Sequence, residues 1–188
     1  MTNVDAVVIG ASAGGIEALS RILPGLPERS RAAYMIVLHL PRHRPSLLAE
    51  VLGARCVLPV VEAQDKVPIM PATVYVAPPD YHLLIDEGPS LALSVDDPIQ
   101  FSRPSIDVLF ETAADLYGER LLGIVMSGAS EDGAKGLAAV AAAGGAAIVQ
   151  DPEEAVAPTL PLGALRYSPG ARVLCVEQIK ELLQHVGC

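Results

Sequence analysis

Short apolar runs alternate with helical patterns along most of this 188-residue chain. The apolar runs predict strands, which are expected at residues 6–9, 34–38, 57–61, 73–77, 121–126, 146–149 and 173–176. Helices are expected between them, at residues 15–23, 46–52, 105–117, 132–143 and 177–185. An alternation of this kind is typical of a parallel sheet that is covered on both faces. We therefore predict an α/β fold with three α/β/α layers and a doubly wound, mainly parallel sheet.

One segment in the middle of the chain departs from this alternation. The sequence HLLIDEGPSLALSV has two alternating runs around Glu87, Gly88 and Pro89, which predicts an antiparallel hairpin at a sheet edge or beside the site. The proline-rich segments KVPIMP and APTLPLG are interpreted as loops, because apolar elements continue on both sides of them. Since none of these segments reads as a domain linker, we expect a single domain over residues 1–188.

The net charge of −9 limits the partners that the chain can bind. Nucleic acids and anionic membranes both attract basic surfaces, so neither is an expected partner. The apolar segment GLAAVAAAGGAAIV is shorter than the roughly 20 residues of a membrane span, so no insertion is expected. Cys56, Cys175 and Cys188 form no CxxC pair, which disfavours a metal site and is typical of a reducing compartment. We expect a cytoplasmic protein that needs no metal or cofactor.

Several polar residues follow directly on predicted strands. They are Ser12, His39, Asp80, Asp151 and the segment from Ser127 to Asp132. The carboxyl ends of parallel strands meet at one edge of a sheet, and ligands bind outside that edge. A serine, a histidine and an acid at one edge are the parts of an acyl-transfer site.

The segment GASAG, residues 10–14, matches the G-x-S-x-G turn that exposes a serine hydroxyl between a strand and a helix. It departs from the dinucleotide-binding pattern, because Ser12 stands where that pattern needs its second glycine. Ser12 is equally suited to cap the following helix, and a glycine-rich turn of this kind can also bind phosphate. The turn alone supports the nucleophile and the helix cap about equally.

His39 is the candidate general base. It follows the next strand along the chain, so its side chain is expected at the same end of the sheet as Ser12. His43 lies further into the loop and is the weaker candidate. His82 and His185 are interpreted as structural or solvated residues.

The third residue of such a site would be an acid that holds the imidazole. Asp132 lies in the glycine-bounded loop SGASEDG, where the alternative is a plain helix cap. Asp80 and Asp151 also follow strands, and the spacing favours Asp132 without excluding Asp151. The chain order Ser, His, Asp differs from that of the α/β-hydrolases, so this is not an ordinary member of that class.

The sequence resembles the catalytic domain of the bacterial chemotaxis protein-glutamate methylesterase (CheB) family. The matching blocks are VVIGASAGGIEAL, VLHLP, VEAQDKVPIMPATVYVAPPDYHLLI, RPSIDVLFETAADLYG, GIVMSGASEDGAKGL and AAGGAAIVQDPEEAVAPTLPLGAL. They cover nearly the whole chain in order. The resemblance implies a serine hydrolase with the catalytic residues Ser12, His39 and Asp132, which removes Asp151 as a serious alternative.

The resemblance also implies the reaction. Family members hydrolyse methyl esters on glutamate side chains of chemoreceptor signalling helices and release methanol, and some also deamidate glutamine. The expected partner is therefore the cytoplasmic helices of a methylated chemoreceptor. Backbone amides near Ala13 and Ala129 are the candidates for binding the oxyanion. The alternative is a non-catalytic or weakly active sensory module that binds a receptor through the same cleft.

This chain departs from the family pattern in several places, among them Ala13 and Ala129, where relatives often have threonine and methionine. Members typically carry a receiver domain before the catalytic domain, whereas this chain begins at the catalytic strand, so control by phosphorylation in cis is not expected. Where relatives read NRHRPS, this chain reads IQFSRPS, which keeps Arg103 and loses the basic residue and the histidine before it. Arg42 and Arg44 lie just beyond His39, and with Arg103 they are candidates to guide an acidic helix into the groove.

Overall fold

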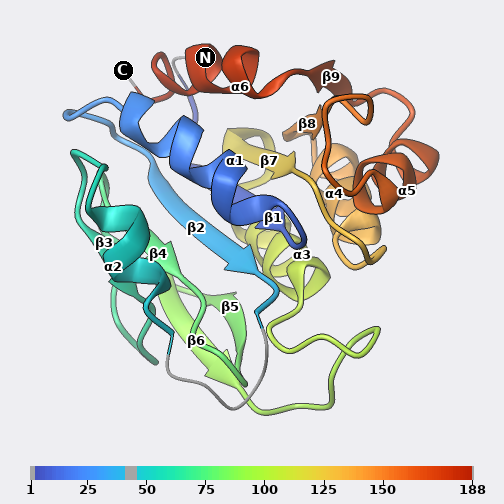
Figure 1. The fold of residues 1–188 in the computed structure, drawn as a ribbon. Coiled ribbons are helices and arrows are strands. Elements are labelled where there is room, and N and C mark those ends of the chain that lie inside the picture. Colours follow the sequence, from blue (N-terminus) through green and yellow to red (C-terminus); the bar gives the residue numbers. More distant parts are fainter. Residues whose placement is uncertain (1–2, 41–45, 188) are drawn as a thin grey trace.

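The computed structural model describes residues 3–40 and 46–187, and within these ranges the main sheet has seven strands, all parallel (Figure 1). Their order across the sheet is β3-β4-β2-β1-β7-β8-β9. The strands are β1 (Ala6–Ala11), β2 (Ala33–Leu38), β3 (Val60–Glu62), β4 (Val74–Val76), β7 (Leu121–Val125), β8 (Ala146–Gln150) and β9 (Arg172–Leu174). A strand is present near each predicted position, and the third lies slightly later in the chain than expected.

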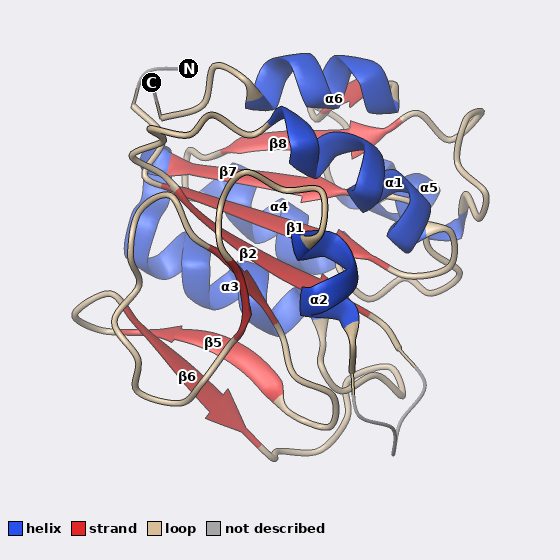
Figure 2. Ribbon diagram, turned by 60° about the vertical axis from the view of Figure 1, so that its left-hand side comes forward, coloured by secondary structure: helices blue, strands red, loops and turns tan. Residues whose placement is uncertain are grey.

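Helices connect most of these strands and cover both faces of the sheet. They are α1 (Gly15–Ile22), α2 (Leu48–Gly53), α3 (Ile106–Tyr117), α4 (Ala134–Ala142), α5 (Thr159–Tyr167) and α6 (Val176–Leu183), with two 3-10 turns, η1 (Leu23–Gly25) and η2 (Gly118–Arg120). Figure 2 shows α1, α2 and α6 on one side of the sheet and α3 and α4 on the other. The predicted three-layer α/β/α fold is confirmed.

The strands are buried on both faces, and this explains why their sequences are almost continuously apolar. Side chains of β1 alternate between two hydrophobic cores, as the two-residue period of a strand requires. Val7 and Ile9 pack in the core under α1, α2 and α6. Val8 packs in the core that contains side chains of α3, α4 and α5.

The predicted antiparallel hairpin is formed by β5 (His82–Asp86) and β6 (Ser90–Ser94). It makes a separate two-stranded sheet, which packs against α3. The backbone N–H of Ile85 donates a hydrogen bond to the Thr112 hydroxyl of that helix at 3.1 Å. The hairpin therefore packs beside α3, in the core on the face of the main sheet that α3 covers, and the loop of residues 95–105 connects β6 to the start of α3.

One prediction about the loops is wrong. The segment APTLPLG was predicted to be a loop, but helix α5 begins inside it, at Thr159. Pro161 is the third residue of this helix, where a backbone N–H has no partner within the helix, so a proline is tolerated there. Leu160 and Ala164 are buried on one face of α5 and give it its place in the core.

The strand order places β1 at the centre of the sheet, between β2 and β7. The chain proceeds from β1 through β2 toward one edge and later returns through β7 toward the other. A reversal of this kind opens a crevice at the carboxyl ends of the central strands. In the described ranges, every helix is too short or too polar to span a lipid bilayer.

Candidate active site

Ser12 lies in the turn that follows β1, at the crevice. Its backbone N–H donates to the carbonyl of Ser127, which follows β7, at 2.9 Å. Gly14, two residues on, has φ 80° and is the N-cap of α1, and no side-chain hydrogen bond caps this helix among the described residues. Ser12 is therefore not the cap of α1. The positive φ explains why glycine is needed at position 14, where an added Cβ would also lie 2.7 Å from the Cβ of Val156.

Ser127 holds this turn in place. Its hydroxyl donates to the carbonyl of Ala13 at 2.7 Å and accepts from the N–H of Ala157 at 2.9 Å. Its own N–H donates to the side-chain oxygen of Gln150, at the end of β8. Ser127 thus joins the Ser12 turn to the loop before α5. From the sequence, Ser127 was only one of several polar residues after β7, and its position directly behind the strand was the available signal.

His39 follows β2, and its backbone N–H donates to the carbonyl of Ala11 at 3.1 Å, next to Ser12. The imidazole Nε2 lies 2.8 Å from Oδ2 of Asp132, and the side chain of His39 is 13% exposed. Because Nε2 is engaged by the carboxylate, Nδ1 is the ring nitrogen left to accept a proton. The Ser12 hydroxyl makes no hydrogen bond within the described part of the chain, and catalytic hydrogen bonds often tighten only when substrate is bound.

Asp132 is completely buried and is surrounded by hydrogen-bond donors. Besides His39, Oδ2 accepts from the N–H of Ile106 at 2.8 Å, while Oδ1 accepts from the Ser105 hydroxyl at 2.7 Å and from the N–H of Asp107 at 3.1 Å. Three of these four donors belong to the N-terminus of α3, whose dipole favours a negative charge. Asp132 therefore binds the N-terminus of α3, whose N-cap is Ser105, and it is not the cap of the following helix α4, whose N-cap is Gly133.

Asp107, in the first turn of α3, accepts hydrogen bonds from the N-terminus of α4. Its Oδ1 accepts from the N–H of Gly133 at 2.9 Å and of Gly136 at 2.7 Å, which lie at the start of α4. Asp107 is buried, and burial raises the pKa of its carboxyl above the ordinary value. The hydrogen bond from Gly136 opposes this increase and the charge of Asp132 adds to it. The two contacts are therefore reciprocal. Asp132, which lies just before α4, binds the N-terminus of α3, and Asp107, which lies in α3, binds the N-terminus of α4.

His82 is buried beside this pair and is structural, as predicted. Its Nδ1 accepts from the N–H of Ser105 at 3.1 Å, and its Nε2 lies 3.2 Å from the carbonyl of Asp97. A ring nitrogen that accepts from an amide carries no proton, so the proton is on Nε2, which donates to Asp97. His82 thereby connects the loop after β6 to Ser105, whose hydroxyl binds Asp132.

A family model described as CheB methylesterase matches residues 7–183 of the chain. The chain belongs to the CheB methylesterase family. A relative from Leptospira interrogans, named putative protein-glutamate methylesterase/protein-glutamine glutaminase, is 42% identical over 180 residues, which cover 96% of this chain and 93% of the relative. Protein-glutamate methylesterase/protein-glutamine glutaminase 2 of Caulobacter vibrioides is 36% identical, and the match covers 94% of this chain and 52% of that protein.

The fold of this CheB family member also matches a solved structure. The crystal structure of the Thermotoga maritima CheB methylesterase catalytic domain superimposes with a TM-score of 0.91 and 33% sequence identity. The match covers 96% of this chain and 97% of the other. The similarity therefore extends over the sheet, both helical layers and the crevice.

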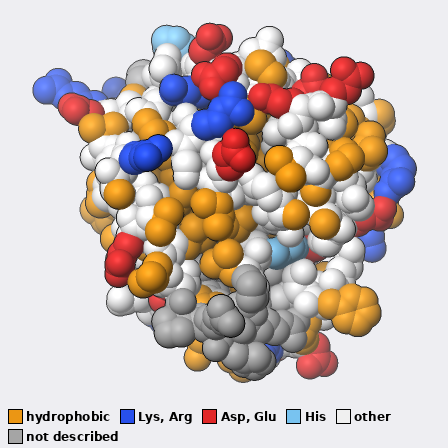
Figure 3. Space-filling model, in the orientation of Figure 1, with side chains coloured by type: hydrophobic (Ala, Val, Ile, Leu, Met, Phe, Trp, Pro, Cys, Tyr) orange, Lys and Arg blue, Asp and Glu red, His pale blue; other side chains and the backbone are white. Residues whose placement is uncertain are grey.

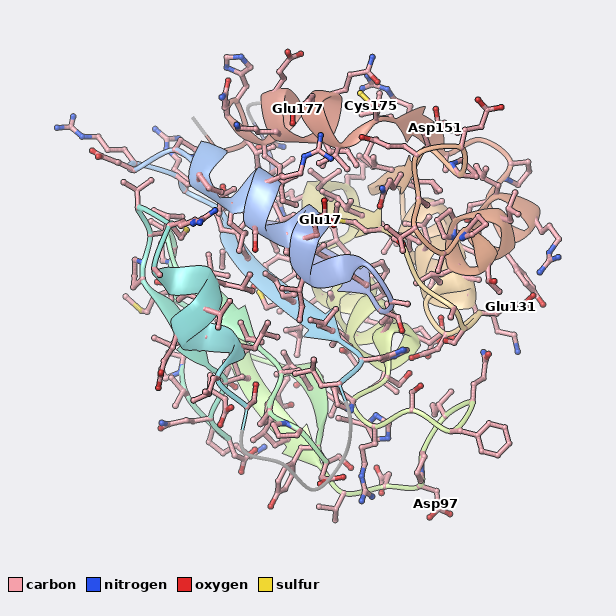
Figure 4. All side chains as sticks on the ribbon, viewed as in Figure 1. Glu17, Asp97, Glu131, Asp151, Cys175 and Glu177 are labelled. Carbon is pink, nitrogen blue, oxygen red and sulfur yellow. The ribbon has the colours of Figure 1, made fainter. Side chains whose placement is uncertain are left out.

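The other acids near the crevice have different partners in this family member. Asp151 follows β8, three strands from β2, and its Oδ1 accepts from the N–H of Glu153. Neighbouring strands are about 4.8 Å apart, so this carboxylate starts more than ten ångströms from the His39 strand. Glu131 points outward and pairs with Arg166 (Figure 4). Asp80 lies in a turn after β4 with φ 65°.

The remaining predicted site residues are the candidate oxyanion donors and the three arginines proposed for the substrate groove. The backbone N–H groups of Ala13 and Ala129 make no hydrogen bond within residues 3–40 and 46–187, and both residues are exposed. Arg103 is partly buried, and its Nη1 donates to the carbonyls of Val95 and Asp96, at 2.7 and 3.0 Å. Arg42 and Arg44 lie outside the described residues.

The described residues contain no group of three or more His, Cys, Asp or Glu side chains that could hold a metal ion. Cys56 is partly buried, its thiol donates to the carbonyl of Leu23 at 3.6 Å, and burial raises the pKa of this thiol. A raised pKa lowers the fraction of reactive thiolate. The side chains that follow β1, β2 and β7 at the crevice include a hydroxyl, an imidazole and a buried carboxylate, those of Ser12, His39 and Asp132.

Proposed function

We propose that this chain is a serine hydrolase that removes methyl esters from glutamate side chains of a chemoreceptor. The observation that carries the proposal is the 2.8 Å bond between His39 and the buried Asp132, at the sheet edge where Ser12 follows the neighbouring strand. The names of the relatives give the reaction class and the glutamate side chain as its substrate. The chemoreceptor as the partner protein is implied by the family.

The geometry supports a definite role for each side chain. Ser12 Oγ attacks the γ-carbonyl carbon of the ester, and His39 Nδ1 takes the hydroxyl proton. Asp132 stabilises the imidazolium through Nε2 and holds the ring in the tautomer that leaves Nδ1 free. The carbonyl oxygen becomes an oxyanion, and the uncommitted N–H groups of Ala13 and Ala129 are the donors proposed to bind it.

The tetrahedral intermediate collapses when the C–O bond to the methoxy group breaks. His39 returns its proton to the leaving oxygen, and methanol departs from a γ-glutamyl ester of Ser12. Water then attacks this ester while His39 accepts a proton from it, which releases the glutamate carboxylic acid and restores the Ser12 hydroxyl. With glutamine as substrate the same steps release ammonia, because the leaving group is an amine.

The closing test is methanol release from a methylated chemoreceptor cytoplasmic fragment. The wild type is expected to release methanol, Ser12→Ala to release none above background, and the matched variant Ser20→Ala, changed further along α1, to keep full activity. If the wild type releases no methanol, the proposed reaction on this substrate is wrong. If Ser12→Ala is as active as the wild type, Ser12 is not the nucleophile.

A second readout is independent of the substrate. A fluorophosphonate probe labels serines activated by a neighbouring base, and the label is found by peptide mass spectrometry. Labelling is expected at Ser12 in the wild type and is expected to disappear in His39→Ala. The guidance of an acidic substrate by Arg42 and Arg44 stays a prediction, which Arg42→Glu with Arg44→Glu tests by the salt dependence of kcat/KM.

A further inference from the structure

A cavity of about 260 Å³ lies at the amino end of the main sheet, whereas the crevice beside Ser12 lies at the carboxyl end. The starts of β1 and β2, the end of α3 and the turn between β5 and β6 surround it. In Figure 2 this turn lies on the side where the strands of the main sheet begin. The backbone N–H of Asp5 donates to the carbonyl of Arg120 at 3.0 Å, and the N–H of Ile69 donates to the carbonyl of Pro89 at 2.9 Å. Backbone hydrogen bonds therefore join the walls of the cavity.

Tyr117, the last residue of α3, lines this cavity and is only 9% exposed. A tyrosine hydroxyl in such a position normally has a hydrogen-bond partner. The Tyr117 hydroxyl has none within residues 3–40 and 46–187. Burial raises the pKa of this hydroxyl, and the charge of Asp5 adds to the increase, so the group keeps its proton. The cavity therefore contains a hydroxyl donor that lacks an acceptor.

The charged residues that line the cavity are two arginines and one aspartate. Arg120 forms an ion pair with Asp5. Arg31 is exposed and has no ion pair in the part of the chain that the structure describes. On the face drawn in Figure 3, by contrast, basic side chains lie among acidic ones over α1 and α6, and Arg21 pairs there with two glutamates. The cavity thus has an excess of positive charge, although the net charge of the chain is −9.

The rest of the cavity wall is mainly apolar. It is formed by Ile69, Pro71, Pro89 and Leu116, with Ala33 at the start of β2. Ile69 and Leu116 also pack against the core on the α3 side of the sheet, which fixes their positions. The volume is below the range of about 300–1,000 Å³ that is typical of sites for drug-sized ligands. The wall therefore suits a small ligand with an apolar body.

We infer that this cavity binds a small organic acid, which has one carboxylate and an apolar body of about the size of a phenyl ring. The Arg31 guanidinium binds the carboxylate with two parallel N–H donors, and the Tyr117 hydroxyl donates a third hydrogen bond to it. The apolar body lies against Ile69 and Leu116. Asp5 is engaged by Arg120, so the described lining residues leave no anion for an ammonium group, and an amino acid is not the expected ligand.

The test is a titration of the isotope-labelled full chain, followed by the NMR signals of its backbone amides. The first probe is hydrocinnamate, which joins a phenyl ring to one carboxylate. We expect it to shift the signals of Asp5, Ala33 and Tyr117 along one saturation curve, with a Kd in the millimolar range because the ligand is small. Hydrocinnamide has the same shape without the charge, and acetate has the charge without the ring. Both are expected to bind at least about tenfold more weakly.

Three variants separate ligand binding from a structural role. Arg31→Gln is expected to raise the Kd for hydrocinnamate about tenfold, because the amide carries no charge. Tyr117→Phe is expected to raise it about fivefold and to keep the wild-type melting temperature, because the hydroxyl has no partner in the free protein. The control is Arg172→Gln, which removes another exposed arginine at the start of β9, four strands from β2, and is expected to leave the Kd unchanged.

Equal affinity for hydrocinnamate and hydrocinnamide would overturn the inference, as would signals at the cavity that do not move at tens of millimolar acid. An equal rise of the Kd in Arg31→Gln and Arg172→Gln would also overturn it, because that pattern indicates a general effect of charge. The dipeptide acetyl-Gly-Leu carries a similar carboxylate at the end of a chain. If it binds more tightly than hydrocinnamate, the ligand is a protein C-terminus and the assignment to a free acid is wrong.

Discussion

Two buried carboxylates, Asp132 and Asp107, lie at the junction of α3 and α4 and differ in their partners. Each accepts backbone N–H groups from the N-terminus of a helix, α3 for Asp132 and α4 for Asp107. Only Asp132 also meets an imidazole, that of His39. Helix N-termini make both buried charges tolerable, and the contact with His39 is what turns one of them into a candidate for catalysis.

The two carboxylates also use their oxygens differently. Both oxygens of Asp132 are surrounded by donors, two on each. Asp107 receives both of its N–H donors on Oδ1, and within the described residues no hydrogen bond reaches its Oδ2. An amide can therefore replace the carboxylate at position 107 while keeping its contacts, whereas at position 132 the NH₂ group must face two donors. Substitution by asparagine separates the two roles.

The largest effect is expected from this matched pair. Asp132→Asn should lower kcat for methanol release by about 10³–10⁴, because an uncharged partner no longer stabilises the imidazolium or holds its tautomer. Asp107→Asn should stay within about tenfold of wild type, since the contacts to Gly133 and Gly136 survive. Both are measured at saturating methylated receptor fragment, with circular dichroism to confirm the fold. A loss in Asp107→Asn as large as in Asp132→Asn would show that Asp107 acts directly on the reaction.

The second prediction concerns stability and pH at Asp107. The unfolded chain releases this proton near the ordinary pKa of 3.8, whereas the folded protein holds it to higher pH because burial raises the pKa. Between these two values the folded state binds more protons than the unfolded state, so this group makes the free energy of unfolding fall as pH rises. Relative to Asp107→Asn, the wild type should therefore lose stability as the pH is raised from about 4 upward.

Urea unfolding of both proteins across this pH range measures the difference. Asp107→Ala is the control, because it removes the acceptor from two buried N–H groups and should be less stable at every pH, by about 1–3 kcal/mol for each group. A wild-type stability that rises with pH relative to Asp107→Asn would contradict the raised pKa.

The residues of the candidate site could be predicted from the sequence only in part. Ser12 and His39 were predicted as site residues because each follows an apolar strand, and parallel strands bring their carboxyl ends together. The choice of Asp132 needed the family resemblance, because Asp151 also follows a strand. What decides between them is the loop after β7, which carries Asp132 back over the start of α3, and no local pattern specifies the path of such a loop.

Asp107 and helix α5 were missed for local reasons. Asp107 was not singled out from the sequence, because an acid in the first turn of a helix is common, and yet it is buried and binds α4. Prolines in APTLPLG suggested a loop, although a proline in the first turn does not break a helix. For Asp107 the deciding contacts join residues far apart in the chain, which periodicity does not show.

The smallest effect is expected from Ser105→Ala, which removes one hydrogen-bond donor from Asp132 and none from Asp107. The Ser105 hydroxyl donates to Oδ1 of Asp132 at 2.7 Å and accepts from the N–H of Val108 as the cap of α3. Its loss should cost about 1 kcal/mol of unfolding free energy and lower kcat by about three- to tenfold, since His39 and two N–H donors remain on Asp132. Ser130→Ala is the control: its hydroxyl accepts from the backbone N–H of Asp132 and does not touch the carboxylate, so kcat should be unchanged. Equal losses of kcat in both variants would mean that the loop as a whole, and not the donors on the carboxylate, sets the activity.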